Sequence, residues 1–142
     1  MPAEESKLFI KRSNIPAAGK GLFTSEAVAK GTRIVEYKGK ITSWKDAAQA
    51  NGTNLYIYYV NKDYVIDASG YQKSLARYAN DATGPGKIKG LTNNCHYVKD
   101  GMRIFIESLR PIAAGEEILV SYGKGYWDTV KENTINKTNS KL

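Results

Sequence analysis

The sequence contains a single cysteine, Cys95, and a single histidine, His96. One cysteine excludes an internal disulfide, and these two side chains alone cannot supply the four ligands of a usual structural zinc site. We therefore expect a metal-free domain that is held together by its hydrophobic core.

Long apolar runs are also lacking. No stretch approaches the ~20 residues of a membrane-spanning helix, and the first seven residues, Met-Pro-Ala-Glu-Glu-Ser-Lys, contain no apolar signal core. We expect an intracellular protein of the cytoplasm, nucleus or nucleoid that does not enter a membrane. The sequons at Asn51 and Asn136 are accordingly interpreted as chance matches.

Blocks of like charge are absent, although 21 Lys and Arg against 14 Asp and Glu give a formal net charge of +7. Scattered cations favour a solvated basic surface. A weak contact with nucleic acid through that surface is the alternative. Charge alone therefore selects no function.

Glycine and tyrosine, by contrast, are abundant, with 13 and 10 copies among 142 residues. The length fits one domain, and the hydrophobic (42%) and charged (25%) fractions are those of an ordinary globular protein. Many turns and an aromatic interior are expected, which indicates a strand-rich fold.

Short segments rich in β-branched and aromatic residues, bounded by Gly, Asn, Asp or Pro, predict strands. The predicted strands are residues 8–11, 21–24, 33–37, 55–60, 64–67, 94–98, 103–108 and 118–121. Turns at residues 61–63 and 99–101 predict two hairpins. Helix signals are confined to residues 43–50 and 72–78, so we expect a mainly β fold with short helices.

One pattern occurs twice. Residues 28–34 (Val-Ala-Lys-Gly-Thr-Arg-Ile) and 112–118 (Ile-Ala-Ala-Gly-Glu-Glu-Ile) share the form apolar-Ala-x-Gly-x-x-Ile. A turn-forming glycine at a fixed step before a strand predicts two similar β-turn units.

Seven short motifs follow one another in a characteristic order. They are Gly19-Lys-Gly-Leu-Phe23, Glu36-Tyr-Lys-Gly39, Tyr56-Ile-Tyr58, Ile66-Asp-Ala68, Arg77-Tyr-Ala-Asn80, Asn94-Cys95 and Gly115-Glu-Glu-Ile-Leu-Val-Ser-Tyr-Gly123. Each is weak alone, but the ordered set resembles the SET-domain family of protein lysine methyltransferases. The resemblance implies a β-clip-like fold of small curved sheets with short helices and a C-terminal pseudoknot, in which the C-terminal segment passes through a loop.

The resemblance also divides the chain. Residues 7–127 correspond to the SET domain, without the cysteine-rich flanks of many members. Residues 1–6 are expected to be a disordered lead-in, and residues 128–142 a polar C-terminal tail that is a candidate lid over the cofactor.

The implied reaction is methyl transfer from S-adenosylmethionine, with S-adenosylhomocysteine as the product. It needs a neutral lysine amine, although free lysine titrates near pH ~10.4. Deprotonation at pH ~8 costs roughly 3 kcal/mol, and desolvation in an apolar channel lowers the pKa of the amine. Tyrosines suit such a channel because each provides an apolar ring, a hydroxyl and a π face that attracts cations.

Tyr122 matches the family's catalytic tyrosine, which orients the amine and holds the methyl through weak C–H···O contacts. Tyr56 and Tyr97 match tyrosines of the lysine channel. Val120 lies where many members carry a Phe or Tyr that influences how many methyl groups are added. Valine leaves space there and Tyr97 can refill it, so the number of methyl groups stays open. Without the motif, each of these side chains would be interpreted as core.

For the cofactor, the resemblance implies backbone contacts from Lys20 and Gly21 to the methionine end. Asn80 and Asp81 correspond to residues that meet the adenosine. Three further residues are assigned to the cofactor site by the same resemblance, with Trp127 stacking on the adenine; they are Tyr78, Tyr122 and Trp127.

The chain departs from the family where Asp81-Ala82 replaces the usual His-Ser, and eleven residues then separate Ala82 from Asn94. If the family histidine mainly presents its backbone, Asp81 can substitute for it; if its side chain matters, cofactor affinity falls. The departure keeps a second interpretation open, a catalytically inactive SET-like module that binds cofactor or peptide. A β-clip domain of the antifreeze-like type is a third, although it would lack the Arg77–Asn80 and Tyr122-Gly123 motifs.

The implied partner is a protein or peptide that presents a lysine, either a histone tail or a non-histone protein. We expect it to bind as an extended peptide, by strand addition to a sheet edge.

Overall fold

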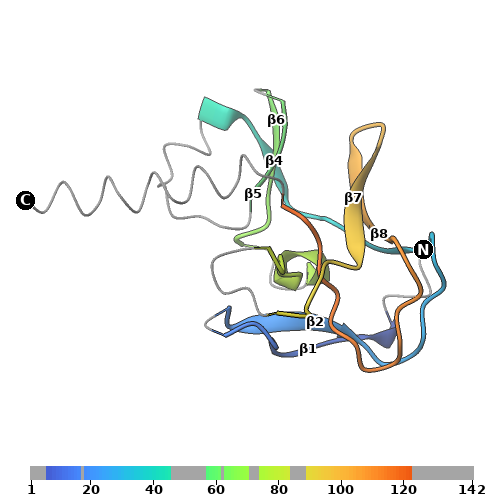
Figure 1. The fold of residues 1–142 in the computed structure, drawn as a ribbon. Helices are drawn as coiled ribbons and strands as arrows, with labels where there is room; N and C mark the ends of the chain where they lie inside the picture. Colours follow the sequence, from blue (N-terminus) through green and yellow to red (C-terminus); the bar gives the residue numbers. More distant parts are fainter. Residues whose placement is uncertain are drawn as a thin grey trace, which may run out of the picture.

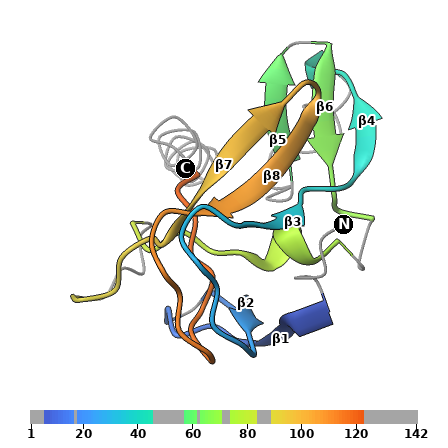
Figure 2. The same cartoon turned by 90° about the vertical axis from the view of Figure 1, so that its right-hand side faces the viewer.

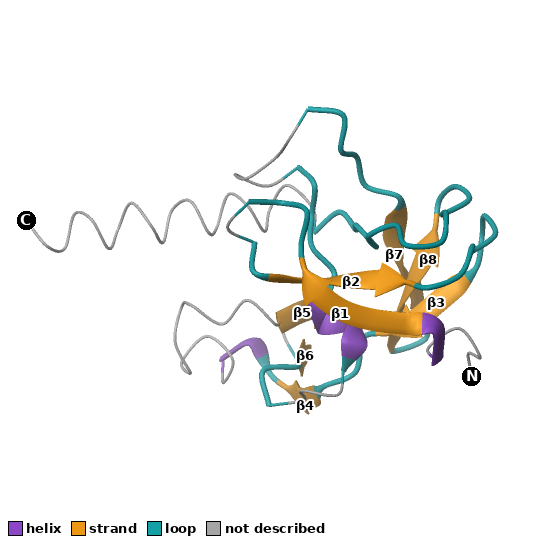
Figure 3. Cartoon of the chain, turned by 90° about the horizontal axis from the view of Figure 1, so that it is seen from below, coloured by secondary structure: helices purple, strands orange, loops and turns teal. Residues whose placement is uncertain are grey.

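The computed structural model describes residues 6–16, 18–45, 57–61, 63–70, 74–83 and 89–122. In this part of the chain, eight short strands form three small antiparallel sheets (Figure 1). Helix is confined to short segments (Figure 3). The predicted mainly β fold is confirmed.

The first sheet is a two-stranded ribbon of β1 (Leu8–Arg12) and β2 (Lys20–Thr24), at the bottom of Figures 1 and 2. Ile10 pairs with Leu22 at its centre. Leu22 is fully buried, so β2 anchors the ribbon to the core and carries the Gly19-Lys-Gly segment at its start.

The second sheet contains β3 (Arg33–Glu36), β8 (Arg103–Ser108) and β7 (Cys95–Asp100), in the order β3-β8-β7. The β7–β8 hairpin turns at Gly101, whose φ of 63° favours glycine. The second predicted hairpin is therefore confirmed, with the strands reaching the turn more closely than expected.

The third sheet has the order β4-β6-β5 and consists of β4 (Lys40–Thr42), β6 (Tyr64–Asp67) and β5 (Ile57–Asn61). The pairing of Asn61 with Tyr64 confirms the first predicted hairpin. Strand β4 was not predicted, because three residues carry little signal and β4 is defined by its pairing with β6.

The helical predictions have a mixed outcome. A 3₁₀ helix, η2 (Leu75–Tyr78), occupies the end of the predicted helix 72–78. Of the predicted helix 43–50, only residues 44–45 are helical among the described residues. None of the helices in the described ranges is both long and apolar enough to cross a membrane.

The two copies of the repeated sequence pattern lie against each other. Val28 and Ile112 form an antiparallel bridge with N···O distances of 2.8 and 2.9 Å. Gly31 and Gly115 adopt similar φ values of 81° and 84°, in the left-handed region that glycine enters without steric cost. The prediction of two similar turn units is confirmed.

The predicted strand at residues 118–121 is wrong. Glu117 bridges Phe23, Leu119 bridges Asn80, and Val120 bridges Cys95. Because the partner changes almost at every residue, no continuous ladder forms. Residues 117–120 are instead enclosed by three segments that are distant in sequence, an arrangement in keeping with the pseudoknot that the resemblance implies.

One hydrophobic core joins the three sheets. Its fully buried members include Leu22, Ile34, Ile106, Ile118 and Val120. Partly buried tyrosines surround it, among them Tyr58, Tyr78, Tyr97 and Tyr122. The candidate site is therefore built directly on the core.

Candidate active site

The Gly19-Lys-Gly segment is fixed through Glu117. Gly21 is buried, and a Cβ atom at this position would overlap Glu117 Oε2. Any other residue at position 21 would therefore displace the Glu117 carboxylate from its present place.

Glu117 is 1% exposed, although it is a carboxylate. It accepts hydrogen bonds from Ser13 Oγ at 2.7 Å, the Asn14 backbone N–H at 2.9 Å and Asn80 Nδ2 at 3.4 Å. Such donors are what a buried carboxylate requires. Glu117 thus joins the end of β1 to Asn80.

Asn80 lies beside the predicted cofactor loop. Its side-chain Nδ2 donates to Lys20 O at 3.0 Å, and its backbone carbonyl oxygen accepts from Val120 N at 2.9 Å. Three of the predicted cofactor-binding residues, Lys20, Gly21 and Asn80, are therefore brought together.

Tyr122 is held from residues 79–81. Its hydroxyl donates a hydrogen bond to Ala79 O, and its backbone N–H donates to Asp81 Oδ2 at 2.8 Å. The ring is partly buried against the core. Tyr122 is thus linked by hydrogen bonds to residues 79–81, and Asn80 in that segment is hydrogen-bonded to Lys20.

Asn94 secures the same segment from the other side. It is 0% exposed, its Nδ2 donates to Glu117 O at 2.8 Å, and its Oδ1 accepts from Leu119 N at 2.9 Å. The sequence analysis included Asn94 in a motif but assigned it no role. Its burial against residues 117–119 is a tertiary feature without a local signal.

Three tyrosines form a cluster that we call the tyrosine cluster: Tyr58 on β5, Tyr97 on β7, and Tyr37, which directly follows β3. The rings of Tyr58 and Tyr97 lie 4.8 Å apart, edge to face, and Tyr37 lies 5.8 and 6.1 Å from them. Burial raises the pKa of Tyr58 above its ordinary value of 10.0. Its hydroxyl therefore stays neutral at physiological pH.

The cluster contains predicted Tyr97, while Tyr56 lies outside the described residues. Tyr37 and Tyr58 were missed as candidates. A signal for Tyr58 was present, because residues two apart on a strand point to the same face. Tyr37 follows β3 and offered no comparable signal.

The remaining predicted residues have different environments. Val120 is fully buried in the core, and Tyr78 carries the Arg77 guanidinium 4.9 Å from its ring centroid. Trp127, residues 1–5 of the predicted lead-in and the whole predicted tail, 128–142, lie outside the described residues. Their roles stay predictions.

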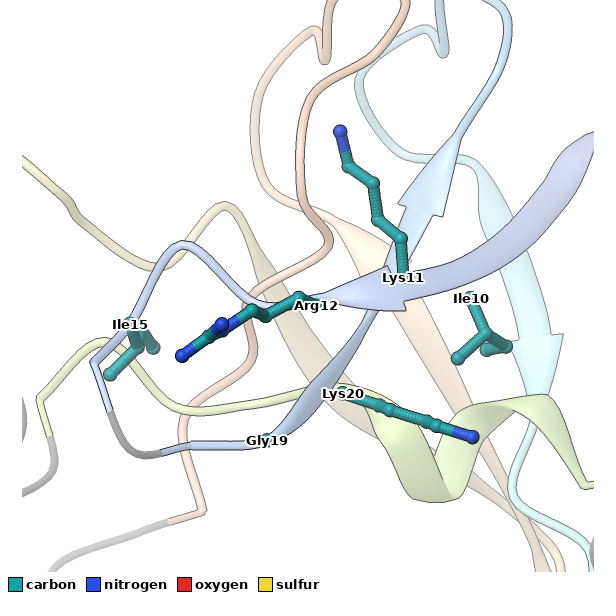
Figure 4. Close-up of a pocket in the computed structure, with 6 residues that line it drawn as sticks. All are labelled: Ile10, Lys11, Arg12, Ile15, Gly19 and Lys20. Atoms are coloured by element: carbon teal, nitrogen blue, oxygen red, sulfur yellow. The ribbon is translucent and has the colours of Figure 1, made fainter.

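A hollow of about 590 Å³ opens beside the Gly19-Lys-Gly segment (Figure 4). Its lining combines cationic side chains with isoleucines, and consists of Ile10, Lys11, Arg12, Ile15, Gly19 and Lys20. The three cations extend in different directions from the backbone in Figure 4. The positive charge of this set would complement the carboxylate at the methionine end of S-adenosylmethionine.

Small antiparallel sheets around an enclosed C-terminal segment, with Tyr122 hydrogen-bonded to residues 79–81, define the SET architecture. The model of the SET domain matches residues 19–123, which is most of the chain. The chain therefore belongs to the SET-domain family.

Curated relatives include lysine methyltransferases. The chain is 29% identical over 119 residues to the N-lysine methyltransferase KMT5A-A of Danio rerio, covering 77% of this chain and 33% of that protein. It is 29% identical over 124 residues to KMT5A of Xenopus tropicalis, with 80% and 36% coverage. It is 26% identical over 133 residues to the histone-lysine N-methyltransferase EZH2 of Chaetomium thermophilum, with 85% and 8% coverage. The chain thus spans about a third of the length of the KMT5A relatives.

Among solved structures, the methyltransferase domain of human PR domain-containing protein 2 superposes with a TM-score of 0.59. Sequence identity is 23%, and the match covers 85% of this chain and 78% of that one. This similarity confirms the predicted fold.

Proposed function

We propose that the chain is an S-adenosylmethionine-dependent protein-lysine N-methyltransferase. The observation that carries the proposal is the position of Tyr122. It is fixed to residues 79–81, and Asn80 in turn contacts Lys20 in the predicted cofactor loop. The candidate catalytic tyrosine and the candidate cofactor loop therefore belong to one site.

The cofactor supplies a methyl group on a positively charged sulfur. Lys20 and Gly21 would hold its methionine end through backbone groups, with Asn80 and Asp81 beside the adenosine. Trp127 is proposed to stack on the adenine.

Tyr122 is proposed to orient the substrate amine. Its hydroxyl hydrogen is donated to Ala79 O, so the lone pairs of the phenolic oxygen are available to accept. Such an oxygen stabilises positive charge and polarised C–H groups at the reacting centre.

The tyrosine cluster is proposed to form the wall of the lysine channel. Tyr56 and Val120 are proposed to be further residues of that wall. Aromatic faces exclude water, which lowers the pKa of the lysine amine, and they attract the cation that precedes deprotonation. The neutral hydroxyl of Tyr58 adds no negative charge that would oppose that deprotonation.

The substrate is proposed to be a protein that presents a lysine on an extended segment inside the cell. Strands β5 and β7 lie at the edges of their sheets, where a peptide strand can pair. A histone tail is the first candidate, because one relative is named a histone-lysine N-methyltransferase. A non-histone protein is the second, since a chain of net charge +7 does not attract a basic tail.

An inactive cofactor- or peptide-binding module is the competing function, and the replacement of His-Ser by Asp81-Ala82 favours it. The test is transfer of labelled methyl from the cofactor to lysine-rich proteins by the wild-type chain and by Tyr122→Phe. Tyr64→Phe is the matched control, because Tyr64 is also partly buried against the core. We expect Tyr122→Phe to lose roughly 10²-fold in rate and Tyr64→Phe to retain it.

Cofactor binding is measured in parallel by calorimetry. If the wild-type chain binds S-adenosylhomocysteine but labels no substrate above the Tyr122→Phe background, the methyltransferase proposal fails and the binding module replaces it.

A further inference from the structure

Asp81 is a buried carboxylate at the point where the chain departs from its family. It is 4% exposed and follows Asn80, which bridges Leu119. A buried carboxylate is unfavourable unless several donors surround it, so its neighbours indicate what it does.

Its two oxygens have different partners. Oδ1 accepts hydrogen bonds from Thr83 N at 2.8 Å, Thr83 Oγ1 at 2.6 Å and Asn93 Nδ2 at 2.9 Å. Oδ2 accepts from the Tyr122 backbone N–H at 2.8 Å. One oxygen therefore joins the two ends of the 83–93 segment, and the other joins the candidate catalytic residue.

Asn93 completes this arrangement. While its Nδ2 donates to Asp81, its Oδ1 accepts from Ala82 N at 2.8 Å. Ala82 is itself buried. The bonds from Thr83 and Asn93 thus hold the Asp81 carboxylate in one orientation, with Oδ2 facing the Tyr122 N–H.

A histidine cannot occupy this position with the same partners. A neutral imidazole has one acceptor nitrogen, whereas a carboxylate offers about four lone-pair sites. The four hydrogen bonds to Asp81 therefore require the carboxylate.

From this geometry we propose that Asp81 is a positioning residue for Tyr122. Its carboxylate fixes the backbone of the tyrosine while Ala79 O fixes the hydroxyl, so Tyr122 is held at its backbone and at its ring hydroxyl by residues two apart in sequence. The effect on turnover rests on the proposed methyltransferase function; the effect on the Tyr122 backbone does not.

The replacement Asp81→Asn distinguishes the roles of the two carboxylate oxygens. The amide has one acceptor, which satisfies more donors when it faces Thr83 and Asn93. Its NH₂ group then opposes the Tyr122 N–H. Thr83→Val is the matched control, because it removes a donor from Oδ1 and leaves the bond from Tyr122 N to Oδ2 in place.

We expect Asp81→Asn to lower kcat about tenfold or more, because small misplacements of a reacting group are costly. The KM for the peptide should change less than about threefold, since none of the groups proposed to contact the peptide is altered. Thr83→Val should keep kcat within about threefold of the wild type. Equal kcat values for Asp81→Asn and the wild type would overturn the proposal.

Amide hydrogen exchange by NMR provides a readout that needs no catalysis. The Tyr122 amide should be protected in the wild type and in Thr83→Val, and unprotected in Asp81→Asn. If the wild type is inactive but shows this pattern, Asp81 still positions Tyr122 and only the methyltransferase function fails. If Asp81→Asn does not fold, rapid exchange of the Tyr122 amide in the wild type overturns the proposal, and protection there and in Thr83→Val supports it.

Discussion

Asn94 and Leu119 are joined by two hydrogen bonds. The Asn94 backbone N–H donates to Leu119 O at 3.0 Å, and Asn94 Oδ1 accepts from Leu119 N at 2.9 Å. The second uses a side chain where a strand would use a carbonyl group. The segment that leads to Tyr122 is therefore secured without a regular sheet.

Replacing Asn94 with leucine should test this bond directly. The change leaves Leu119 N–H and Glu117 C=O buried without the side-chain partners they have now. At about 1–3 kcal/mol for each unsatisfied group, the free energy of unfolding should fall by about 2–6 kcal/mol. Urea denaturation measures it. Asn14→Leu, on an exposed side chain, should change it by less than about 0.5 kcal/mol.

Gly39, which directly precedes β4 of the third sheet, is another position with no room for a side chain. A Cβ atom there would lie 2.6 Å from Asp67 C and O and 2.8 Å from Ala68 N. Backbone atoms cannot rotate away, so Gly39→Ala should destabilise the fold by about 1–3 kcal/mol. Gly70→Ala is the control, because nothing lies within 4 Å of its Cβ position. Equal thermal midpoints for the two variants would contradict the packing argument.

Cys95 should be unreactive in the folded protein. The thiol is fully buried, and desolvation raises its pKa to about 12. Because the thiolate is the reactive form, the thiol stays protonated at pH ~8. An aromatic disulfide reagent should label Cys95 only after denaturant is added. Rapid stoichiometric labelling of the native chain would show that the site opens.

The ion pair between Glu36 and Arg103 should contribute to the pH dependence of stability. The hydrogen bond from Arg103 lowers the pKa of Glu36 below its ordinary value of 4.5. A lowered folded-state pKa stabilises the native state above the unfolded-state pKa, and the contribution disappears as the pH falls through the folded value.

Arg103→Met tests that pH dependence. The difference in unfolding free energy between the wild type and the variant should be largest near pH 7 and should shrink below pH ~4. Loss of the Arg103 contact with the Phe105 ring, 5.0 Å away, does not depend on pH and leaves a constant offset. A difference that is the same at pH 7 and pH 3 would assign the whole effect to that ring contact.

The tyrosine cluster should influence how many methyl groups are added, given the proposed function. Tyr97→Phe and Tyr58→Phe keep the edge-to-face rings, which lie 4.8 Å apart, but remove a hydroxyl from the proposed channel wall. Each should shift the products toward higher methylation, because a larger space accommodates more methyl groups. Mass spectra of a methylated peptide measure the shift. Unchanged product ratios in both variants would place the cluster outside the channel.

The sequence predicted features that are encoded locally. The β5–β6 and β7–β8 hairpins were recognisable because turn residues separate short runs of β-forming residues. The turn units at Gly31 and Gly115 were recognisable because positive φ selects glycine.

Features that depend on distant partners were not predictable. The interpretation of residues 118–121 as a strand failed because Glu117, Leu119 and Val120 each pair with a different segment. The resemblance placed Asp81 at the cofactor site, but its contact with Tyr122 spans 41 residues. Hydrophobic periodicity and the strand or helix propensities of residues describe neighbours in sequence, and they carry no information about contacts at such separations.

The enclosure of residues 117–120 also affects how the protein is made. Phe23, Asn80 and Cys95 acquire these bridging partners only when the segment has been synthesised, and buried Ile118 and Val120 then complete the core. Contacts of such long sequence separation form slowly. We expect the nascent chain to remain open to protease until residue 120 has left the ribosome, which limited proteolysis of stalled chains of increasing length would reveal.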